Sequence, residues 1–319
     1  MSLPPSSGPG PSPETLVSPS PDACPRPAMP VAWWLALRPK TLTVSLAPVL
    51  VGTAIAYAET ATLTLWPALV ALLAAILIQI GTNLHNDVAD FERGADTPDR
   101  LGPARATAMG WLAPSAVRRA AWLAFAAAFL LGILLVARGG WPIVVIGLCS
   151  LAAGWAYTGG PKPIAYTPLG ELFVLIFFGL AAVGGSHYLQ TFSLSLPALL
   201  GALMLGAFAA AVISVNNTRD SLTDARVGKR TLAVALGRTA MNRVYAFELA
   251  LPFALLPVLA AQLAKGWWML LPCLMAPLTG MLVRRFREFP VGPDFNTLLA
   301  ATARLQFVFS VLLTLALAL

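Results

Sequence analysis

Two acidic segments carry the residue types from which a reactive site could be built. The first includes Asp87, Asp90 and Asp96, follows a long apolar run directly, and holds five of the chain's 14 acidic residues. The second includes Asp220 and Asp224, which would lie about one turn apart on a helix. Acidic side chains at the end of an apolar helix are costly to bury without a compensating charge, so both segments are candidate sites.

The spacing and type of these side chains favour a hard divalent cation. Carboxylates one turn apart, such as Asp220 and Asp224, repel each other unless a cation binds between them. Carboxylate and amide oxygens suit Mg²⁺, which takes one or two protein carboxylates and adds phosphate and water. Neither segment is rich in the imidazole or thiolate ligands that suit zinc or copper. The predicted metal ligands are Asn86, Asp87, Asp90, Asp96, Asp220 and Asp224.

Basic and amide side chains near the acids complete a predicted clamp for Mg²⁺ and a diphosphate. Two acidic helix ends that face each other would hold the metal, and neighbouring Lys and Arg would neutralise the remaining phosphate charge. In this clamp Asp87, Asp90, Asp220 and Asp224 are the predicted catalytic residues. For Tyr157, anchoring at the membrane surface is an equal alternative to binding. The predicted diphosphate-binding residues are Asn83, Asn86, Arg100, Arg105, Tyr157, Lys162, Asn217, Lys229 and Arg230.

The elements that must position these residues are membrane helices. Of the 319 residues, 58% are hydrophobic and 11% are charged, whereas about a quarter of a soluble protein is charged. Apolar runs of roughly 20 residues predict an all-α, polytopic membrane bundle of about nine transmembrane helices. The basic residues behind the net charge of +7 lie between the spans, where they face anionic lipid, so no nucleic-acid partner is expected. The expected spans are 41–58, 65–85, 117–137, 141–157, 169–189, 196–216, 244–263, 267–283 and 301–319.

Charge and composition also predict the domain organisation and the orientation. Residues 1–30 are rich in Pro and Ser and are expected to form a disordered tail, followed by a transmembrane domain over residues 31–319. All basic residues except Arg138 and Lys265 fall on the N-terminal side of the spans. We therefore expect a cytoplasmic N-terminus, both acidic segments on the cytoplasmic side, and the C-terminus on the opposite side.

The two motifs Asn86-Asp-Val-Ala-Asp90 and Asp220-Ser-Leu-Thr-Asp224 resemble the aspartate-rich motifs of the UbiA-type intramembrane prenyltransferases. The similarity runs from about residue 33 to residue 243, and the Gly94-Ala-Asp96 continuation resembles the naphthoate branch of that family. It leaves open whether Asp96 binds metal. Supporting stretches are Arg38-Pro-Lys-Thr41, Asp99-Arg-Leu-Gly-Pro-Ala-Arg105, Tyr157-Thr-Gly-Gly-Pro161 and Pro168-Leu-Gly-Glu171.

This resemblance implies a UbiA-type fold and an activity. The expected enzyme would use Mg²⁺ to transfer a polyprenyl group from polyprenyl diphosphate to 1,4-dihydroxy-2-naphthoate, with loss of CO₂ and diphosphate, giving demethylmenaquinone. It would act as a multi-pass protein of the bacterial plasma (inner) membrane, with the lipid bilayer as a partner. The alternatives are a related aromatic or phytyl transferase, of the phylloquinone or 4-hydroxybenzoate type, and a cation-coupled transporter. In a transporter the acids would be ion sites, but the two segments form a parallel repeat, unlike the inverted repeats of many ion-coupled transporters.

Overall fold

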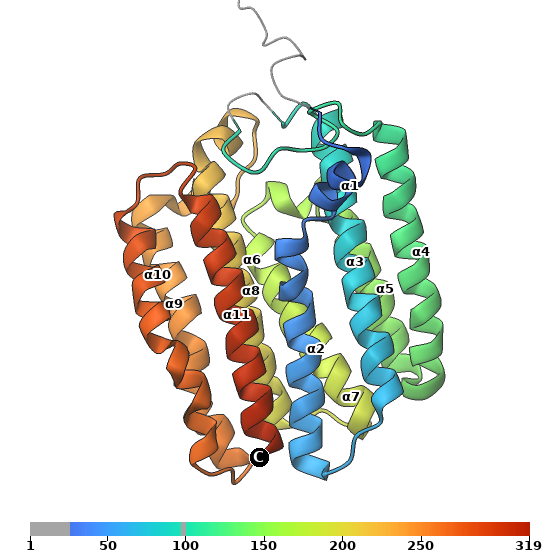
Figure 1. Ribbon diagram of the computed structural model, residues 1–319, viewed down its shortest axis with the longest axis vertical. Coiled ribbons are helices and arrows are strands. Elements are labelled where there is room, and N and C mark those ends of the chain that lie inside the picture. Colours follow the sequence, from blue (N-terminus) through green and yellow to red (C-terminus); the bar gives the residue numbers. More distant parts are fainter. Residues whose placement is uncertain (1–25, 97–99) are drawn as a thin grey trace, which may run out of the picture.

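The chain folds into a bundle of long helices that run up and down a common axis (Figure 1). The computed structural model describes residues 26–96 and 100–319, and these residues contain no β-strand. The predicted all-α fold is therefore confirmed. Most of the predicted tail, residues 1–25, and Asp99 lie outside the described residues, and helix α1 (Met29–Leu37) begins within the last two residues of that tail.

Within the described part of the chain, nine apolar helical segments cross the bundle. Eight are long and apolar enough to span a membrane, and the ninth, α5 (Trp141–Ala156), is shorter. This agrees with the nine predicted spans, of which the fourth is one of the two shortest. The eight are α2 (Pro39–Thr60), α3 (Leu65–Glu92), α4 (Pro114–Gly139), the continuous α6 (Gly170–Val174), η3 (Leu175–Gly184) and α7 (Gly185–Thr191), α8 (Leu196–Arg226), α9 (Leu232–Gln262), η4 (Trp267–Met275) with α10 (Ala276–Glu288), and α11 (Phe295–Ala318).

Helix α8 is the central element of the bundle. In its most apolar stretch 83% of the residues are buried, against 17% for the corresponding stretch of α3. Small residues allow η3 to pack closely on it, because a Cβ atom at Gly179 would lie 2.4 Å from the carbonyl oxygen of Ala202. On the α8 side, a Cβ atom at Gly206 would lie 2.8 Å from the carbonyl oxygen of Leu175. The position of α8 is thus set by close backbone contact.

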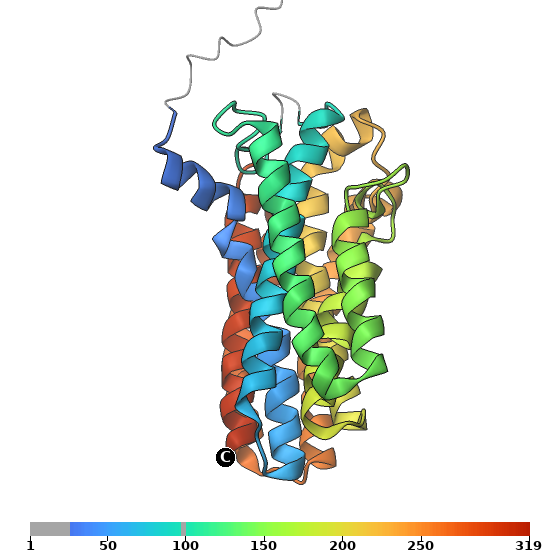
Figure 2. The ribbon, with the colours of Figure 1, turned by 90° about the vertical axis from the view of Figure 1, so that its right-hand side faces the viewer.

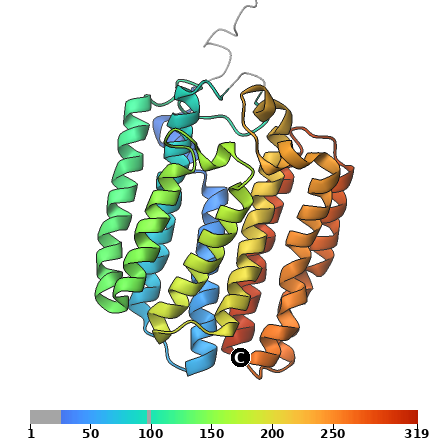
Figure 3. The ribbon, with the colours of Figure 1, turned by 180° about the vertical axis from the view of Figure 1, so that it is seen from behind.

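Helices α3 and α8 both continue beyond their apolar stretches and reach the same end of the bundle (Figures 1 and 3). They are 28 and 31 residues long, more than the ~20 residues that a membrane crossing needs. The predicted helical extension through both acidic motifs is therefore confirmed. The loops after α3, α5 and α8 gather at this end, whereas the C-terminus lies at the opposite end.

Helix α1 projects sideways from the loop end of the bundle (Figure 2). It is joined to α2 through Arg38, whose φ of 53° is in the left-handed region that non-glycine residues rarely adopt. Its buried residues Ala32 and Ala36 belong to the same apolar cluster as Leu84 and Val88 of α3. This contact fixes the α1–α2 junction, and with it Arg38, against the acidic end of α3.

Candidate active site

A large cavity opens between the two acidic helix ends and continues into the bundle. Its volume is about 640 Å³. Its wall is polar near the loops and apolar deeper inside, where it follows α3, α4, α5 and η3 as far as Leu189 of α7. This form suits a ligand with a charged head and a hydrocarbon tail. The polar wall consists of Arg38, Thr41, Gln79, Thr82, Asn83, Asn86, Asp90, Arg100, Arg105, Tyr157, Thr158, Asn216, Asn217, Asp220, Asp224, Lys229 and Thr231.

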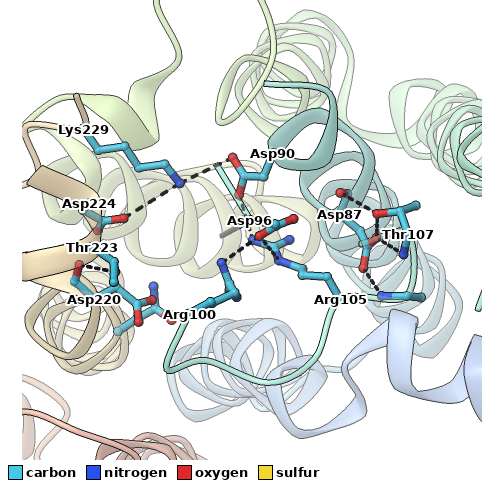
Figure 4. Close-up of polar contacts among 12 residues, drawn as sticks. Asp87, Asp90, Asp96, Arg100, Arg105, Thr107, Asp220, Thr223, Asp224 and Lys229 are labelled. Atoms are coloured by element: carbon cyan, nitrogen blue, oxygen red, sulfur yellow. Dashed lines mark hydrogen bonds and ion pairs between the residues drawn. The ribbon is translucent and has the colours of Figure 1, made fainter. Parts of the chain in front are cut away.

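The carboxylate of Asp90 contacts side chains from three loops at the cavity mouth, and Figure 4 labels those of Arg105 and Lys229. Its Oδ2 accepts a hydrogen bond of 2.8 Å from Arg105. Its Oδ1 accepts a hydrogen bond of 3.2 Å from the hydroxyl of Tyr166. The same oxygen lies 3.4 Å from Nζ of Lys229. Because Asp90 is only 2% exposed, these cations supply the compensating charge that a buried carboxylate needs.

Asp87 faces the loop after α3 and does not line the cavity. Its two carboxylate oxygens accept hydrogen bonds from the backbone N–H groups of Ala106 and Thr107, at 3.0 and 2.9 Å. The hydroxyl of Thr107 also donates to Asp87. Asp87 therefore holds in place the loop that carries Arg105, and in the structure its carboxylate is occupied by that loop.

Asp96 lies behind the cavity wall between two arginines (Figure 4). Its Oδ1 is 3.0 Å from Arg100 and 3.4 Å from Arg105. Burial raises the pKa of Asp96, although both arginines act in the opposite direction. Its Oδ2 is buried without a hydrogen-bond partner. Both arginines line the cavity, so Asp96 orients side chains that reach it.

The acids of α8 line the opposite wall of the cavity. Asp220 accepts two hydrogen bonds from the guanidinium of Arg219, at 2.8 and 2.6 Å. Asp224, one turn later, lies 3.9 Å from Nζ of Lys229. Since Lys229 also contacts Asp90, its ammonium bridges the α3 and α8 motifs, and the ring of Tyr166 lies 4.6 Å from the same nitrogen. The structure thus brings the two predicted motifs together around one cation.

The predicted asparagines take up positions in the cavity wall. Asn83 donates to the carbonyl oxygen of Leu37 at 3.0 Å and so ties α3 to the α1–α2 junction. Asn86 accepts a hydrogen bond of 2.5 Å from Thr158. Asn217 donates at 2.9 Å to Glu171, whose second oxygen is buried without a partner. Each asparagine therefore has at least one structural contact and also borders the cavity.

The structure separates the remaining predicted residues. Tyr157 lines the cavity, and burial raises the pKa of its hydroxyl. Lys162 and Arg230 are exposed and do not line the cavity. The backbone N–H of Arg230 donates to the carbonyl oxygen of Tyr166 at 3.1 Å. Arg230 therefore supports the loop that carries Tyr166, and Lys162 lies at the surface.

Among the site residues that the sequence analysis missed are three with a charged or phenolic side chain. Arg38 lines the cavity from the α1–α2 junction, Tyr166 contacts Asp90, and Arg219 pairs with Asp220. Arg38 begins the supporting stretch Arg38–Thr41 and Arg219 directly precedes the motif of Asp220, so their position was an available signal. Tyr166 had no such signal, because its contact with Asp90 spans 76 positions of the chain.

The cavity mouth has a surplus of positive charge. Four cationic side chains, those of Arg38, Arg100, Arg105 and Lys229, line it together with three carboxylates. Burial and the neighbouring Arg105 lower the pKa of Arg38 to about 9, and the same two causes lower the pKa of Arg100. Arg38 Nη2, Arg100 Nε and Arg105 Nη1 are buried without a hydrogen-bond partner. Unpaired guanidinium nitrogens of this kind fit a multivalent anion such as diphosphate.

The donor set at the mouth also fits Mg²⁺ in the presence of phosphate. No group of three His, Cys, Asp or Glu side chains among the described residues is close enough to hold a metal alone. Mg²⁺ does not require such a group, because it takes one or two carboxylates and completes its sphere with phosphate and water. Asn86 with Asp90 and Asp220 with Asp224 offer hard oxygen ligands on the two walls of the cavity.

Comparisons with known proteins agree with this geometry. The model of the UbiA prenyltransferase family matches residues 45–292. A 1,4-dihydroxy-2-naphthoate octaprenyltransferase from Bacillus subtilis is 33% identical over 285 residues, which is 89% of this chain and 91% of the relative. An enzyme of the same description from Mycobacterium tuberculosis is 39% identical over 236 residues, 74% of this chain and 79% of the relative.

Solved structures share the fold at low sequence identity. A UbiA homologue from Aeropyrum pernix has a TM-score of 0.64 at 14% identity and covers 87% of this chain and 96% of its own. A UbiA homologue from Archaeoglobus fulgidus, solved with DMAPP and Mg²⁺ bound, has a TM-score of 0.62 at 13% identity and covers 88% of this chain and 99% of its own. The predicted fold is thus confirmed by proteins of very different sequence.

Proposed function

The chain belongs to the UbiA prenyltransferase family, and we propose that it transfers a polyprenyl group from polyprenyl diphosphate to 1,4-dihydroxy-2-naphthoate. CO₂ and diphosphate leave in this reaction, and demethylmenaquinone is the product after oxidation. The observation that carries the proposal is the pairing of the α3 and α8 acidic motifs across Lys229, at the head of an apolar cavity. The relatives that cover most of the chain support the naphthoate acceptor.

The charged mouth would bind the diphosphate of the donor. Lys229, Arg100 and Arg105 can donate to its oxygens, since all three line the cavity beside the carboxylates. Mg²⁺ held by Asn86, Asp90, Asp220 and Asp224 would neutralise the charge that develops on the leaving group. The cationic side chains are already in place before the donor binds, so little reorganisation is needed as the bond to the diphosphate breaks.

The bonds that change in the reaction are then determined by the chemistry of the two substrates. The carbon–oxygen bond of the allylic diphosphate breaks, and the electron pair leaves with the diphosphate. The ring carbon of the acceptor that bears the carboxylate forms a new bond to the allylic carbon. Loss of CO₂ returns the electron pair of its carbon–carbon bond to the ring and restores aromaticity. The chain's own residues bind the leaving group and orient the donor.

The deeper part of the cavity suits the prenyl tail. Its wall is formed by aromatic and branched apolar side chains, including Phe173, Phe177 and Phe178 on the α6–η3 segment. Removal of a hydrocarbon tail from water into such a wall is favourable by roughly 25 cal/mol per Å² of buried surface. An apolar wall also keeps water away from the allylic carbon, which would otherwise be hydrolysed.

We further propose a bacterial plasma (inner) membrane location with the site on the cytoplasmic side. The chain is a multi-pass membrane protein, and the residues that the structure describes include eight helices long and apolar enough to span a membrane. The bias of basic residues toward the loops at the site end supports a cytoplasmic position for this end. The proposed partners are therefore the lipid bilayer, the polyprenyl diphosphate and the naphthoate.

The acceptor is tested by giving purified protein a polyprenyl diphosphate with naphthoate and 4-hydroxybenzoate acceptors in parallel. We expect a decarboxylated product only from 1,4-dihydroxy-2-naphthoate, and we expect EDTA to abolish its formation and Mg²⁺ to restore it. Product formation from 4-hydroxybenzoate alone would overturn the proposed naphthoate acceptor. Full activity in EDTA would overturn the proposed Mg²⁺ dependence. Ion transport in liposomes without prenyl product would favour the cation-coupled transporter.

A further inference from the structure

The first turn of α11 connects the acidic motif of α8 with the loop that carries Arg100 and Arg105. Asn296 in this turn uses both ends of its side-chain amide. Its Oδ1 accepts a hydrogen bond of 2.7 Å from Nη1 of Arg219. Its Nδ2 donates at 2.9 Å to the carbonyl oxygen of Leu101. Asn296 lies beyond residues 45–292, which the family model matches, and no motif of the sequence includes it.

The partner of Asn296 on α8 is held rigidly. Arg219 is 1% exposed, and its Nε and Nη2 bond the two oxygens of Asp220 at 2.8 and 2.6 Å. Its Nη2 also donates to Asn216 at 2.8 Å. With Asn296 on Nη1, every nitrogen of the guanidinium has a partner. Because its guanidinium is held on all sides, Arg219 provides a fixed surface against which neighbouring backbone can pack.

The backbone of the loop that carries Arg100 and Arg105 packs directly against the guanidinium of Arg219. A Cβ atom at Gly102 would lie 2.8 Å from Nη2 of Arg219 and 3.0 Å from Nη2 of Arg100. Such distances leave no room for a side chain at this position. The backbone of the loop therefore approaches the guanidinium as closely as glycine permits, and Asn296 ties down the residue just before it.

Residues 100–107 form a strap that is fixed at both ends. Asn296 anchors the strap at Leu101, and Asp87 anchors it at Ala106 and Thr107 through their backbone N–H groups. Arg100, next to the first anchor, and Arg105, between the two anchors, both line the cavity. The two anchors come from α11 and α3, so the strap spans the mouth between helices that are far apart in the sequence.

We propose that Asn296 is a positioning residue for the diphosphate site. By holding Leu101 to Arg219, it keeps Arg100 and Arg105 at the cavity mouth before the donor binds. Ordering the strap in advance reduces the entropy that donor binding would otherwise lose. Asn296 does not line the cavity, so it acts through the strap. The inference rests on the proposed function only in taking a diphosphate as the ligand at the mouth.

The test compares Asn296→Ala and Asn296→Asp with the control Thr297→Ala. The Asp variant can still accept from Arg219, but it cannot donate to the carbonyl oxygen of Leu101. Thr297 is exposed in the same helical turn, and its hydroxyl bonds only the carbonyl oxygen of Asp294. Both Asn296 variants should raise KM for the polyprenyl diphosphate about tenfold, the scale of losing one or two hydrogen bonds. KM for the acceptor should change less than twofold, and the control should match wild type.

Two further measurements separate positioning from general damage. Mg²⁺–pyrophosphate binding, followed by calorimetry in detergent, should weaken about tenfold in both Asn296 variants. Tryptic cleavage after Arg100 and Arg105 should be at least about three times faster, while cleavage after the exposed Arg287 of α10 should keep its wild-type rate. Gly102→Ala, which disturbs the same contact, should add little to Asn296→Ala, because residues in one network are not additive.

The outcomes distinguish this inference from the proposed function. The strap anchor would be overturned by any of three results. These are an Asn296→Asp variant that behaves like wild type, an equal rise in KM for both substrates, and faster cleavage at all sites. If the wild-type protein does not prenylate naphthoate but its Asn296 variants bind pyrophosphate more weakly, the anchor is supported and the proposed acceptor is overturned. A wild-type protein that does not bind pyrophosphate would overturn both.

Discussion

The carboxylate of Asp87 accepts the backbone N–H of Thr107 at 2.9 Å, and this contact joins α3 to a loop 20 positions later. The Ala106 N–H bonds the second oxygen of the same carboxylate, so Asp87 is occupied by backbone on both sides. Asp90, only three residues along the same helix, instead faces the cavity and three cationic or phenolic side chains. Two neighbouring acids of one motif therefore have different tasks.

This division predicts different metal dependence for the two acids. Asp90→Asn should raise the Mg²⁺ concentration for half-maximal activity at least about tenfold, because a ligand charge at the mouth is lost. Asp87→Asn should leave that concentration within about twofold but lower Tm by at least about 2 °C, since its amide would leave a buried backbone N–H without an acceptor. Mg²⁺ titrations of initial rate and thermal unfolding in detergent measure both. An equal change in Mg²⁺ requirement would show that Asp87 also serves the metal.

Lys229 is expected to be essential because it bridges Asp90 and Asp224. Lys229→Met should lower kcat at least about 100-fold, the scale of losing a group that stabilises charge in the transition state. Lys229→Arg should recover part of this loss, because it keeps the charge but changes the geometry. Steady-state rates with naphthoate measure the effect, and Arg287→Met on the exposed end of α10 is the control. A decrease in kcat of less than threefold for Lys229→Met would show that Lys229 is not essential to the reaction.

Tyr166 should contribute through two separable contacts. Tyr166→Phe removes the hydrogen bond to Asp90 but keeps the ring beside Lys229, so kcat/KM should fall about 3–10-fold. Tyr166→Leu also removes the ring and should cost a further several-fold. The two variants are compared in the same assay. If the Phe variant matches wild type while the Leu variant does not, only the ring matters.

Lys162 and Arg230 should be far less important than their positions in the sequence indicate. Both are exposed and neither lines the cavity, so Lys162→Met and Arg230→Met should each change kcat/KM less than about threefold. The backbone contact of Arg230 with Tyr166 remains in its variant. Measurements across donor concentrations would reveal a role in binding. A tenfold rise in KM for the donor in either variant would show that the substituted residue does contribute to diphosphate binding.

His187 should stabilise the fold at the opposite end of the bundle without acting in the reaction. It is fully buried, lies 2.6 Å from Glu59, and its Nδ1 is 3.1 Å from the carbonyl oxygen of Ser193. His187→Ala should therefore lower Tm by at least about 2 °C, because buried partners lose their hydrogen bonds. Its kcat should stay within about twofold of wild type at a temperature where both are folded. A selective loss of kcat would contradict a purely structural role.

The helical framework could be predicted from the sequence for a simple physical reason. A membrane crossing needs a long apolar run, so the nine spans and the extension of α3 and α8 through their acidic motifs follow from hydropathy and motif position. Residues one turn apart share a helix face in any α-helix, which brings Asp220 and Asp224 to the same wall. These are local properties of the chain.

The division of labour among the polar residues depended on tertiary structure. On α3, Asn83 and Asp90 point in nearly the same direction, whereas Asp87 is turned from Asp90 by about 60°, and only the packing decides which direction meets the cavity. The contacts that place Tyr166, Arg219 and Asn296 join residues from different helices and loops. Such pairings leave no periodic pattern in the sequence. They arise only when the helices pack and each buried polar group must find a partner.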